Sequence, residues 1–231
     1  MADPTFKPAL IIVDVQEDFC PPNGALAVPS APSILPALNT LLAYPFILKI
    51  ATKDWHPAGH ISFASSHPGK APFTDFATIT NPQNAAETYE SRLWPDHCIQ
   101  GTPGAELLGG WDVEKVDEVI EKGQMGEVEM YSAFYPPLER PRVGDSGLAA
   151  LLKGKGVTDV FVVGLAADYC VAATAEDAVK EGFRAYIVEE GTRAVVPEGW
   201  GEKKRELEGR GVRVVGMGGE EVERVRGGTL G

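Results

Sequence analysis

Cys170 is the residue of this sequence whose type and position best suit nucleophilic chemistry. It follows an apolar run over residues 160–163, typical of a buried parallel strand, which breaks at Gly164. The alanine-rich segment beyond it predicts a helix, so the thiol would lie where unpaired backbone N–H groups and the helix dipole favour a thiolate and can hold an oxyanion. A buried structural cysteine is an equally good interpretation of this stretch alone.

An acid and an ammonium group follow two further strand patterns. Asp14 comes directly after the apolar residues 9–13, and Lys122 comes near the end of a strand predicted at residues 114–123, which has Val116, Val119 and Ile120 and is rimmed by acids. Ligands of open parallel sheets gather beyond the carboxyl ends of the strands, and an ion pair there allows both charges to exist out of bulk water. The period of two along a strand puts Gln16 on the same side as Asp14. The alternatives are a capping or solvated acid for Asp14 and a surface charge for Lys122.

Asp54, His56 and His97 form a candidate metal site. Asp54 and His56 follow a strand predicted at residues 46–52 and are two residues apart, so in an extended backbone both point to the same side, as two ligands of one cation must. His97 completes a two-histidine, one-carboxylate set that leaves coordination positions open and suits zinc, manganese or iron(II). The alternative for an isolated Asp-x-His is a capped turn with a solvated imidazole.

The remaining histidines and Cys98 are interpreted as neighbours of this site. All four histidines of the sequence lie between residues 56 and 97. Cys98 is a rival ligand, but neighbours in an extended chain point in opposite directions, so His97 and Cys98 are not expected to serve together. His60 and His67 are interpreted as hydrogen-bonding loop residues or as partners of the metal ligands.

These side chains require a sheet that brings several strand ends to one edge. Strand patterns alternate with helical patterns, which predicts a single α/β domain over residues 1–231, with a six-stranded, mainly parallel sheet and helices on both faces in a Rossmann-like three-layer arrangement. Strands are expected at residues 9–13, 46–52, 114–123, 157–165, 183–189 and 212–215, and helices at residues 30–44, 146–153, 170–182 and 202–208. A long active-site insertion without a credible strand is expected at about residues 57–113, and a flexible tail from about residue 217.

Composition narrows the class of partner and the compartment. The 231 residues carry a formal net charge of −12, which argues against a nucleic-acid surface because phosphate binding needs clustered Lys and Arg. The apolar runs are too short to cross a bilayer, so we expect no membrane partner. Three widely spaced cysteines do not suggest a disulfide framework, so we expect a reducing compartment, the cytoplasm or the nucleus. No glycine-rich phosphate-binding loop follows a strand, so nucleotide binding is not supported.

Taken together, the motifs resemble those of the nicotinamidases (pyrazinamidases) of the isochorismatase-like cysteine hydrolase superfamily. The resemblance covers nearly the whole chain and implies the isochorismatase-like form of the fold described above. It rests on the segments DVQEDF (14–19), DWHP (54–57), SFAS (62–65), WPDHC (94–98), QGT (100–102), KG (122–123), YSAF (131–134) and GLAADYCV (164–171).

The resemblance implies a role for each candidate at the strand ends. The catalytic triad would be Asp14, Lys122 and Cys170. One divalent metal ion, with zinc favoured over manganese or iron, would be completed by waters and held by Asp54, His56 and His97.

The resemblance also implies an oxyanion hole and a ring pocket. The peptide bond before Ala166 would be cis, which would turn the amides of Ala166 and Cys170 into the oxyanion hole. Ala167 stands where related sequences carry threonine or bulkier residues, which would change the shape of the pocket. The substrate-binding residues would be Phe19, Trp94, Tyr131 and Ala166.

The implied activity is the hydrolysis of nicotinamide to nicotinate and ammonia through a thioester on Cys170, in NAD salvage. Asp14 would take the thiol proton and later activate the water that releases nicotinate. A carboxyl group with a pKa of about 3.9 is a poor base for a thiol with a pKa of about 8.5, so the site must raise the first, lower the second, or both. Lys122 and the helix terminus are expected to lower the pKa of the thiol.

Two other functions fit the same residues. The first is an amidase that acts on another small amide or on a ureido substrate. The second is a metal or thiol sensor without turnover, although a sensor would need neither Asp14 nor Lys122. The sequence leaves the breadth of substrates open and is compatible with a homo-oligomer.

Overall fold

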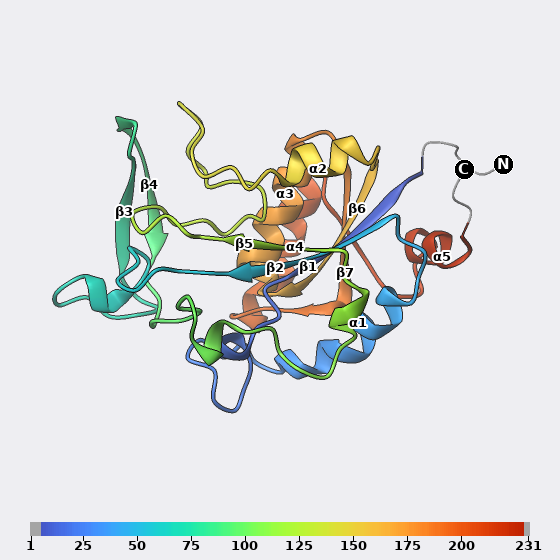
Figure 1. The fold of residues 1–231 in the computed structure, drawn as a ribbon, viewed down its shortest axis with the longest axis horizontal. Helices are drawn as coiled ribbons and strands as arrows, with labels where there is room; N and C mark the ends of the chain where they lie inside the picture. Colours follow the sequence, from blue (N-terminus) through green and yellow to red (C-terminus); the bar gives the residue numbers. More distant parts are fainter. Residues whose placement is uncertain (1–5, 229–231) are drawn as a thin grey trace.

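The computed structural model describes residues 6–228 and contains the predicted parallel sheet (Figure 1). Its strands are β1 Pro8–Val13, β2 Leu48–Asp54, β5 Glu118–Lys122, β6 Asp159–Leu165, β7 Arg184–Arg193 and β8 Arg213–Val215. They form a six-stranded sheet in the order β5-β2-β1-β6-β7-β8, in which every neighbouring pair is parallel. The α/β class predicted from the sequence is confirmed.

Helices cover both faces of this sheet because its central strands are apolar on both sides. β1 and β6 are buried along their whole length, as nearly unbroken apolar runs require. One core cluster includes residues of α1 (Leu35–Leu42) and α5 (Glu220–Arg226). The other includes residues of α2 (Leu148–Gly154), α3 (Ala172–Lys180) and α4 (Trp200–Gly209). Figure 1 shows α2 and α3 on one side of the sheet and α1 on the other.

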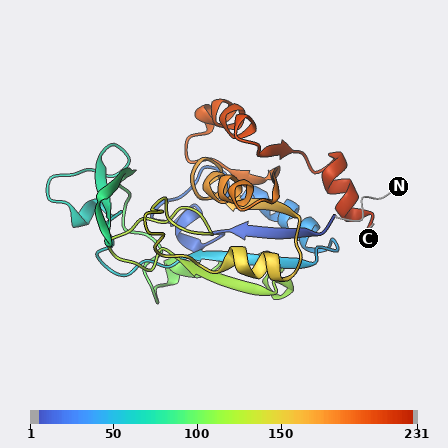
Figure 2. The ribbon, with the colours of Figure 1, turned by 90° about the horizontal axis from the view of Figure 1, so that it is seen from above.

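A two-stranded hairpin occupies part of the long insertion, where the sequence predicted no credible strand. β3 (Phe76–Asn81) pairs antiparallel with β4 (Asn84–Arg92), and the hairpin stands at the end of the molecule opposite α5 (Figure 2). The prediction was wrong here because β4 is exposed or half-exposed along nearly its whole length, so its sequence lacks a clear apolar alternation. The next strand also starts later than predicted, because a short 3-10 helix, Val113–Lys115, precedes β5.

The C-terminal segment also differs from its prediction. A flexible tail was expected from about residue 217, but α5 forms there, with Val222 and Val225 buried. The guanidinium carbon of Arg224 lies 3.9 Å from the ring centroid of Phe6, which attaches the helix to the chain just before β1. The end of the predicted tail, residues 229–231, lies outside the described residues.

Among the described residues, no helix combines the length and the apolar composition that crossing a membrane would require.

Candidate active site

The carboxyl ends of four adjacent strands meet at one edge of the sheet and bring four polar side chains together. Asp14 follows β1, Asp54 ends β2, Lys122 ends β5, and Cys170 follows β6. The Lys122 ammonium nitrogen lies 3.0 Å from Asp14 Oδ2, 2.8 Å from Asp54 Oδ1 and 3.7 Å from Cys170 Sγ. All four residues are buried. An acid, an ammonium group and a thiol therefore share one crevice, as their strand-end positions led us to expect.

A sharp turn after β1 aims Asp14 into this crevice. Its φ of 49° lies in the left-handed region. The Asp14 N–H donates to the Thr52 hydroxyl at 3.1 Å, and that hydroxyl donates to Asp14 Oδ1 at 2.6 Å. Gly164 of β6 permits the close packing of the two strands here, because it has a φ of 106° and a Cβ at this position would lie 2.0 Å from the carbonyl oxygen of Val13.

Burial has the largest effect on the proton affinities in the crevice. It raises the pKa of Asp14, although the adjacent Lys122 ammonium acts in the opposite direction. Burial also raises the pKa of the Cys170 thiol well above its usual value, again against the effect of Lys122. The expectation of a lowered thiol pKa was therefore wrong in its net direction, because removing the thiolate from water outweighs the ammonium. Proton transfer from Cys170 to Asp14 could be helped by a lower thiol pKa or by a higher carboxyl pKa, and the structure provides the second.

The backbone at Ala166 has the conformation that the resemblance implied. The peptide bond between Leu165 and Ala166 is cis. The Ala166 carbonyl oxygen then accepts hydrogen bonds from the N–H groups of Tyr169 and Val171, both at 3.1 Å, as the chain enters the π-helical turn that leads into α3. Ala166 and Cys170 line the same cavity, so their amides are the candidates for an oxyanion hole.

Asp54, His56 and His97 lie close enough together to bind one ion. One ligand atom from each residue lies within 4.8 Å of the other two. Asp54 Oδ2 is 3.3 Å from His56 Nε2 and 3.6 Å from His97 Nε2, and all three residues are buried. Cys98 is not part of this cluster; its backbone has a φ of 46° and its N–H donates to Asp18 Oδ2 at 2.7 Å. Of the two rival ligands, the structure brings His97 to the cluster.

The hydrogen bonds of the two imidazoles leave both Nε2 atoms available to a cation. His56 Nδ1 bonds to the Gly123 carbonyl oxygen at 2.9 Å, and His97 Nδ1 bonds to the Pro95 carbonyl oxygen at 2.8 Å. A carbonyl oxygen can only accept, so both Nδ1 atoms carry a proton. His56 Nε2 is buried and has no hydrogen-bond partner among the described residues. Burial lowers the pKa of His56, but Asp54 outweighs this effect and raises it to about 9, so an ion bound here would replace a proton.

His60 and His67 both form hydrogen bonds, His67 within the loop and His60 to Ser62 and to Val128 beyond it. His60 bonds through Nδ1 to the Ser62 hydroxyl at 2.8 Å and through Nε2 to the Val128 carbonyl oxygen at 3.1 Å. Its ring stacks on His56 with 4.0 Å between centroids. Burial, aided by His56, lowers the pKa of His60 to about 4, so this ring stays neutral. His67 Nε2 bonds to a backbone carbonyl oxygen at 2.7 Å.

An aromatic cavity faces Cys170. The Trp94 indole N–H donates to the Tyr131 hydroxyl at 3.0 Å, and the Trp94 and Tyr169 rings meet edge to face with 4.8 Å between centroids. The cavity is narrow, with a volume of about 20 Å³. The wall residues that the sequence predicted are Phe19, Trp94, Tyr131 and Ala166, and those it did not predict are Leu26, Glu129, Tyr169 and Val195.

Some residues of the site had a signal in the sequence and others had none. Tyr169 directly precedes the candidate nucleophile, so its place beside the cavity could have been inferred. Glu129 is a buried acid whose Oε1 accepts the N–H of Met130 at 2.7 Å, but it lies in a loop without any pattern. Gln16, expected on the same side as Asp14, follows the left-handed turn at Asp14, and its amide bonds the backbone of Asp54.

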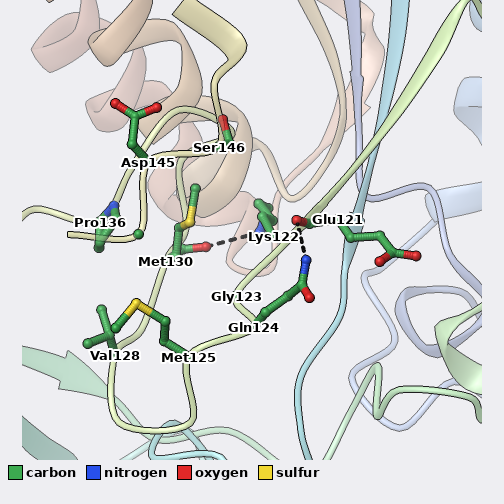
Figure 3. Close-up of a pocket in the computed structure, with 11 residues that line it drawn as sticks. Glu121, Lys122, Gly123, Gln124, Met125, Val128, Met130, Pro136, Asp145 and Ser146 are labelled. Atoms are coloured by element: carbon green, nitrogen blue, oxygen red, sulfur yellow. Dashed lines mark hydrogen bonds between the residues drawn. The ribbon is translucent and has the colours of Figure 1, made fainter.

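A second cavity lies on another side of Lys122 (Figure 3). It has a volume of about 280 Å³, and the Lys122 ammonium donates to the Met130 carbonyl oxygen at 3.1 Å beside it. The Glu121 carboxylate points away from this cavity. Among the described residues that line it, none is Cys170 or a member of the metal cluster, so it is separate from the space that faces the thiol. Its apolar wall residues are Met125, Val128, Met130 and Pro136.

The parallel fold and the polar cluster at its carboxyl edge define an isochorismatase-like α/β hydrolase. A family model described as the isochorismatase domain matches residues 8–217, and the chain belongs to this family. The resemblance inferred from the sequence is confirmed.

Known relatives agree with this assignment. The nicotinamidase of Acinetobacter baylyi is 43% identical over 187 residues, which cover 81% of this chain and 81% of the relative. The structure of the yeast nicotinamidase bound to the inhibitor nicotinaldehyde is 30% identical, with a TM-score of 0.83 over 90% of this chain and 99% of that one. The structure of the pyrazinamidase of Pyrococcus horikoshii in complex with zinc is 34% identical, with a TM-score of 0.68 over 91% and 99% of the two chains.

Proposed function

We propose that this protein is a nicotinamidase, which hydrolyses nicotinamide to nicotinate and ammonia and so serves the salvage of NAD. The observation that carries the proposal is the position of Lys122, within reach of Asp14 and Cys170 next to an aromatic cavity. The relatives support the substrate, because the Acinetobacter protein is a nicotinamidase and the yeast enzyme binds nicotinaldehyde.

Asp14 and Cys170 would carry out the covalent steps. Asp14 takes the thiol proton, and the sulfur attacks the carboxamide carbon, so that a tetrahedral oxyanion forms against the amides of Ala166 and Cys170. The proton passes from Asp14 to the leaving nitrogen, ammonia departs and a thioester remains. Asp14 then takes a proton from water, whose oxygen attacks the thioester carbon. The sulfur leaves, regains the proton as a thiol, and nicotinate is released.

Lys122 would keep the crevice electrically balanced during these steps. Burial lowers the pKa of Lys122, but Asp14 and Asp54 outweigh that effect and raise it well above its usual value, so the ammonium keeps its charge. A fixed positive charge 3.7 Å from Cys170 Sγ favours the thiolate whenever Asp14 accepts the proton. We therefore assign Lys122 the role of stabilising the thiolate.

A divalent ion would be held by Asp54, His56 and His97, and we propose zinc. The related Pyrococcus structure contains zinc, and the carboxylate and the two Nε2 atoms are donors that zinc accepts in open sites. When bound, the ion would act as a Lewis acid that holds the pyridine nitrogen of the substrate. These three side chains would position it next to the ring walls formed by Phe19 and Trp94.

The aromatic walls would select a flat ring. Phe19, Trp94 and Tyr131, together with Ala166, surround the space between the thiol and the metal cluster. A cavity of about 20 Å³ has room for little more than one water molecule, so the walls have to move apart to admit a pyridine ring.

We further propose that residues 1–231 act as one catalytic domain in the cytoplasm. The insertion at about residues 57–113 would complete the site, because it carries Trp94 and His97. Three free, buried cysteines support a reducing compartment.

Ammonia release from nicotinamide tests the proposal. The wild type should release ammonia, and Cys170→Ala should lose at least about 10³-fold in turnover because the nucleophile is gone. Cys20→Ala is the matched control, since Cys20 is also buried but lines neither the thiol cavity nor the metal cluster and should leave turnover unchanged. A wild type that is inactive on nicotinamide but hydrolyses a ureido compound would replace the proposed substrate, and near-normal turnover by Cys170→Ala would exclude the covalent route.

A further inference from the structure

Gln16 connects its own segment to two others, at Asp54 and at Ala105. Its side chain is buried. The Asp54 N–H donates to Gln16 Oε1 at 2.8 Å, and Gln16 Nε2 donates to the carbonyl oxygens of Asp54, at 2.8 Å, and Ala105, at 2.9 Å. The side-chain amide therefore uses its oxygen and both of its hydrogens on backbone groups.

The amide of Gln16 takes the place of a missing strand. β1 pairs with β2 from Ala9 and Leu48 up to Ile12 and Ala51, and then turns away at Asp14. Beyond that point β5 still pairs with one edge of β2, up to the pair Asp54 and Lys122. Among residues 6–228, no strand pairs with the other edge there. A carboxamide offers the same donor and acceptor as a peptide group, so Gln16 satisfies the Asp54 backbone as a neighbouring strand would.

The position of the Asp54 backbone matters because each of its two carboxylate oxygens has partners of its own. Oδ1 accepts the Lys122 ammonium at 2.8 Å, and Oδ2 faces the Nε2 atoms of His56 and His97. A small shift of this residue would move one oxygen away from the ammonium and the other away from the imidazoles. Side chains that hold metal ligands in place typically contribute 10–100-fold to metal affinity.

We propose that Gln16 is a positioning residue of the metal site, which holds Asp54 so that its carboxylate can bind an ion and Lys122 together. The inference rests on the metal-binding part of the proposed function and is independent of the substrate. Replacement by leucine removes all three hydrogen bonds. Replacement by glutamate keeps the length and the acceptor but removes both donors, so that a carboxylate oxygen faces two carbonyl oxygens.

Asn81 provides a matched control. Its amide is also buried and makes three hydrogen bonds, donated to Glu87 Oε2 and to the Pro141 carbonyl oxygen and accepted from the Gln83 N–H. It lies on β3, and neither the thiol cavity nor the metal cluster includes it. Asn81→Leu therefore removes an equivalent set of hydrogen bonds without touching Asp54.

The experiment measures the affinity of each metal-stripped protein for zinc alone, in competition with a chromophoric chelator. Gln16→Leu and Gln16→Glu should bind zinc about 10–100-fold more weakly than the wild type, whereas Asn81→Leu should stay within about twofold of it. Urea unfolding of the metal-free proteins should show similar losses of stability for Gln16→Leu and Asn81→Leu. If Gln16→Leu does not fold, the zinc affinity of Gln16→Glu, which preserves the side-chain volume, tests the inference.

Several results would overturn the inference. They are wild-type zinc affinity in both Gln16 variants, an equal loss in Asn81→Leu, or a wild type that does not bind zinc. A wild type that binds zinc but releases no ammonia from nicotinamide would refute the proposed function and leave the role of Gln16 intact.

Discussion

Replacing Lys122 by methionine should both destabilise the fold and abolish turnover, because two buried carboxylates share its charge. The ammonium nitrogen lies 3.0 Å from Asp14 Oδ2 and 2.8 Å from Asp54 Oδ1, and methionine preserves most of the volume without the charge. Removing one partner of a buried ion pair costs about 3–5 kcal/mol, because the remaining charge is uncompensated. For a domain of this size, that loss corresponds to a fall in Tm of about 6–20 °C.

The loss of unfolding free energy in the Lys122→Met variant should become smaller as the pH falls. Burial alone would raise the pKa of Asp54, but His56 and Lys122 hold it well below its usual value in the wild type. A lowered pKa gives stability that is present above the unfolded-state pKa and is lost as the pH falls through the folded-state pKa. Without the ammonium, the Asp54 carboxylate can be neutralised by a proton at higher pH. The difference between variant and wild type is therefore largest at neutral pH and smaller in acid.

Urea unfolding at about pH 7.5 and about pH 5, with a chelator present to exclude metal ions, measures this difference, and ammonia release measures turnover. Lys153→Met is the control, because its ion pair with Glu181 involves a half-exposed lysine side chain and should be worth less than about 1 kcal/mol. Equal unfolding free energies for Lys122→Met and the wild type at both pH values, or a loss that grows in acid, would refute the reasoning.

Three further predictions concern the backbone, the ion and the C-terminal helix. Gly164→Ala should lose about 3–4 kcal/mol in urea unfolding, since its Cβ would collide with the Val13 carbonyl oxygen; an unchanged midpoint would contradict this. In a Cys170→Ala background, His97→Ala or chelator treatment should each weaken nicotinamide binding at least about tenfold by calorimetry, and equal affinities would exclude the contact with the ion. Val225→Asp should lower the free energy of unfolding by about 3 kcal/mol and abolish hydrogen-exchange protection of α5. Rapid exchange of α5 in the wild type would instead support the flexible tail expected from the sequence.

The strand-end residues could be predicted because buried parallel strands have a simple pattern. β1 and β6 are apolar on both faces, so their carboxyl ends were visible at Asp14 and before Cys170. Spacing within an extended segment was also enough to pair Asp54 with His56. That these side chains meet in one crevice followed from the parallel topology, which brings the carboxyl ends of the strands to the same edge of the sheet.

The parts that could not be predicted depend on contacts between distant segments. The thiol pKa depends on how fully the folded chain removes Cys170 from water, which no local pattern records. The hydrogen bonds of the Gln16 amide follow a left-handed turn at Asp14, which a period of two along a strand does not anticipate. α5 is short and highly charged, and its two buried valines become informative only once the sheet beneath them is known.

The location of Lys122 has a consequence for heat inactivation. It ends β5, an outermost strand bonded on one side only, and the Gly123 carbonyl that orients His56 follows directly. Edge strands unfold locally more readily than central ones. Separation of β5 from β2 would therefore remove the Lys122 ammonium from the crevice and break the hydrogen bond that orients His56 in the same event. On warming, we expect activity and any ion bound at the Asp54, His56 and His97 cluster to be lost while the central strands of the sheet are still folded.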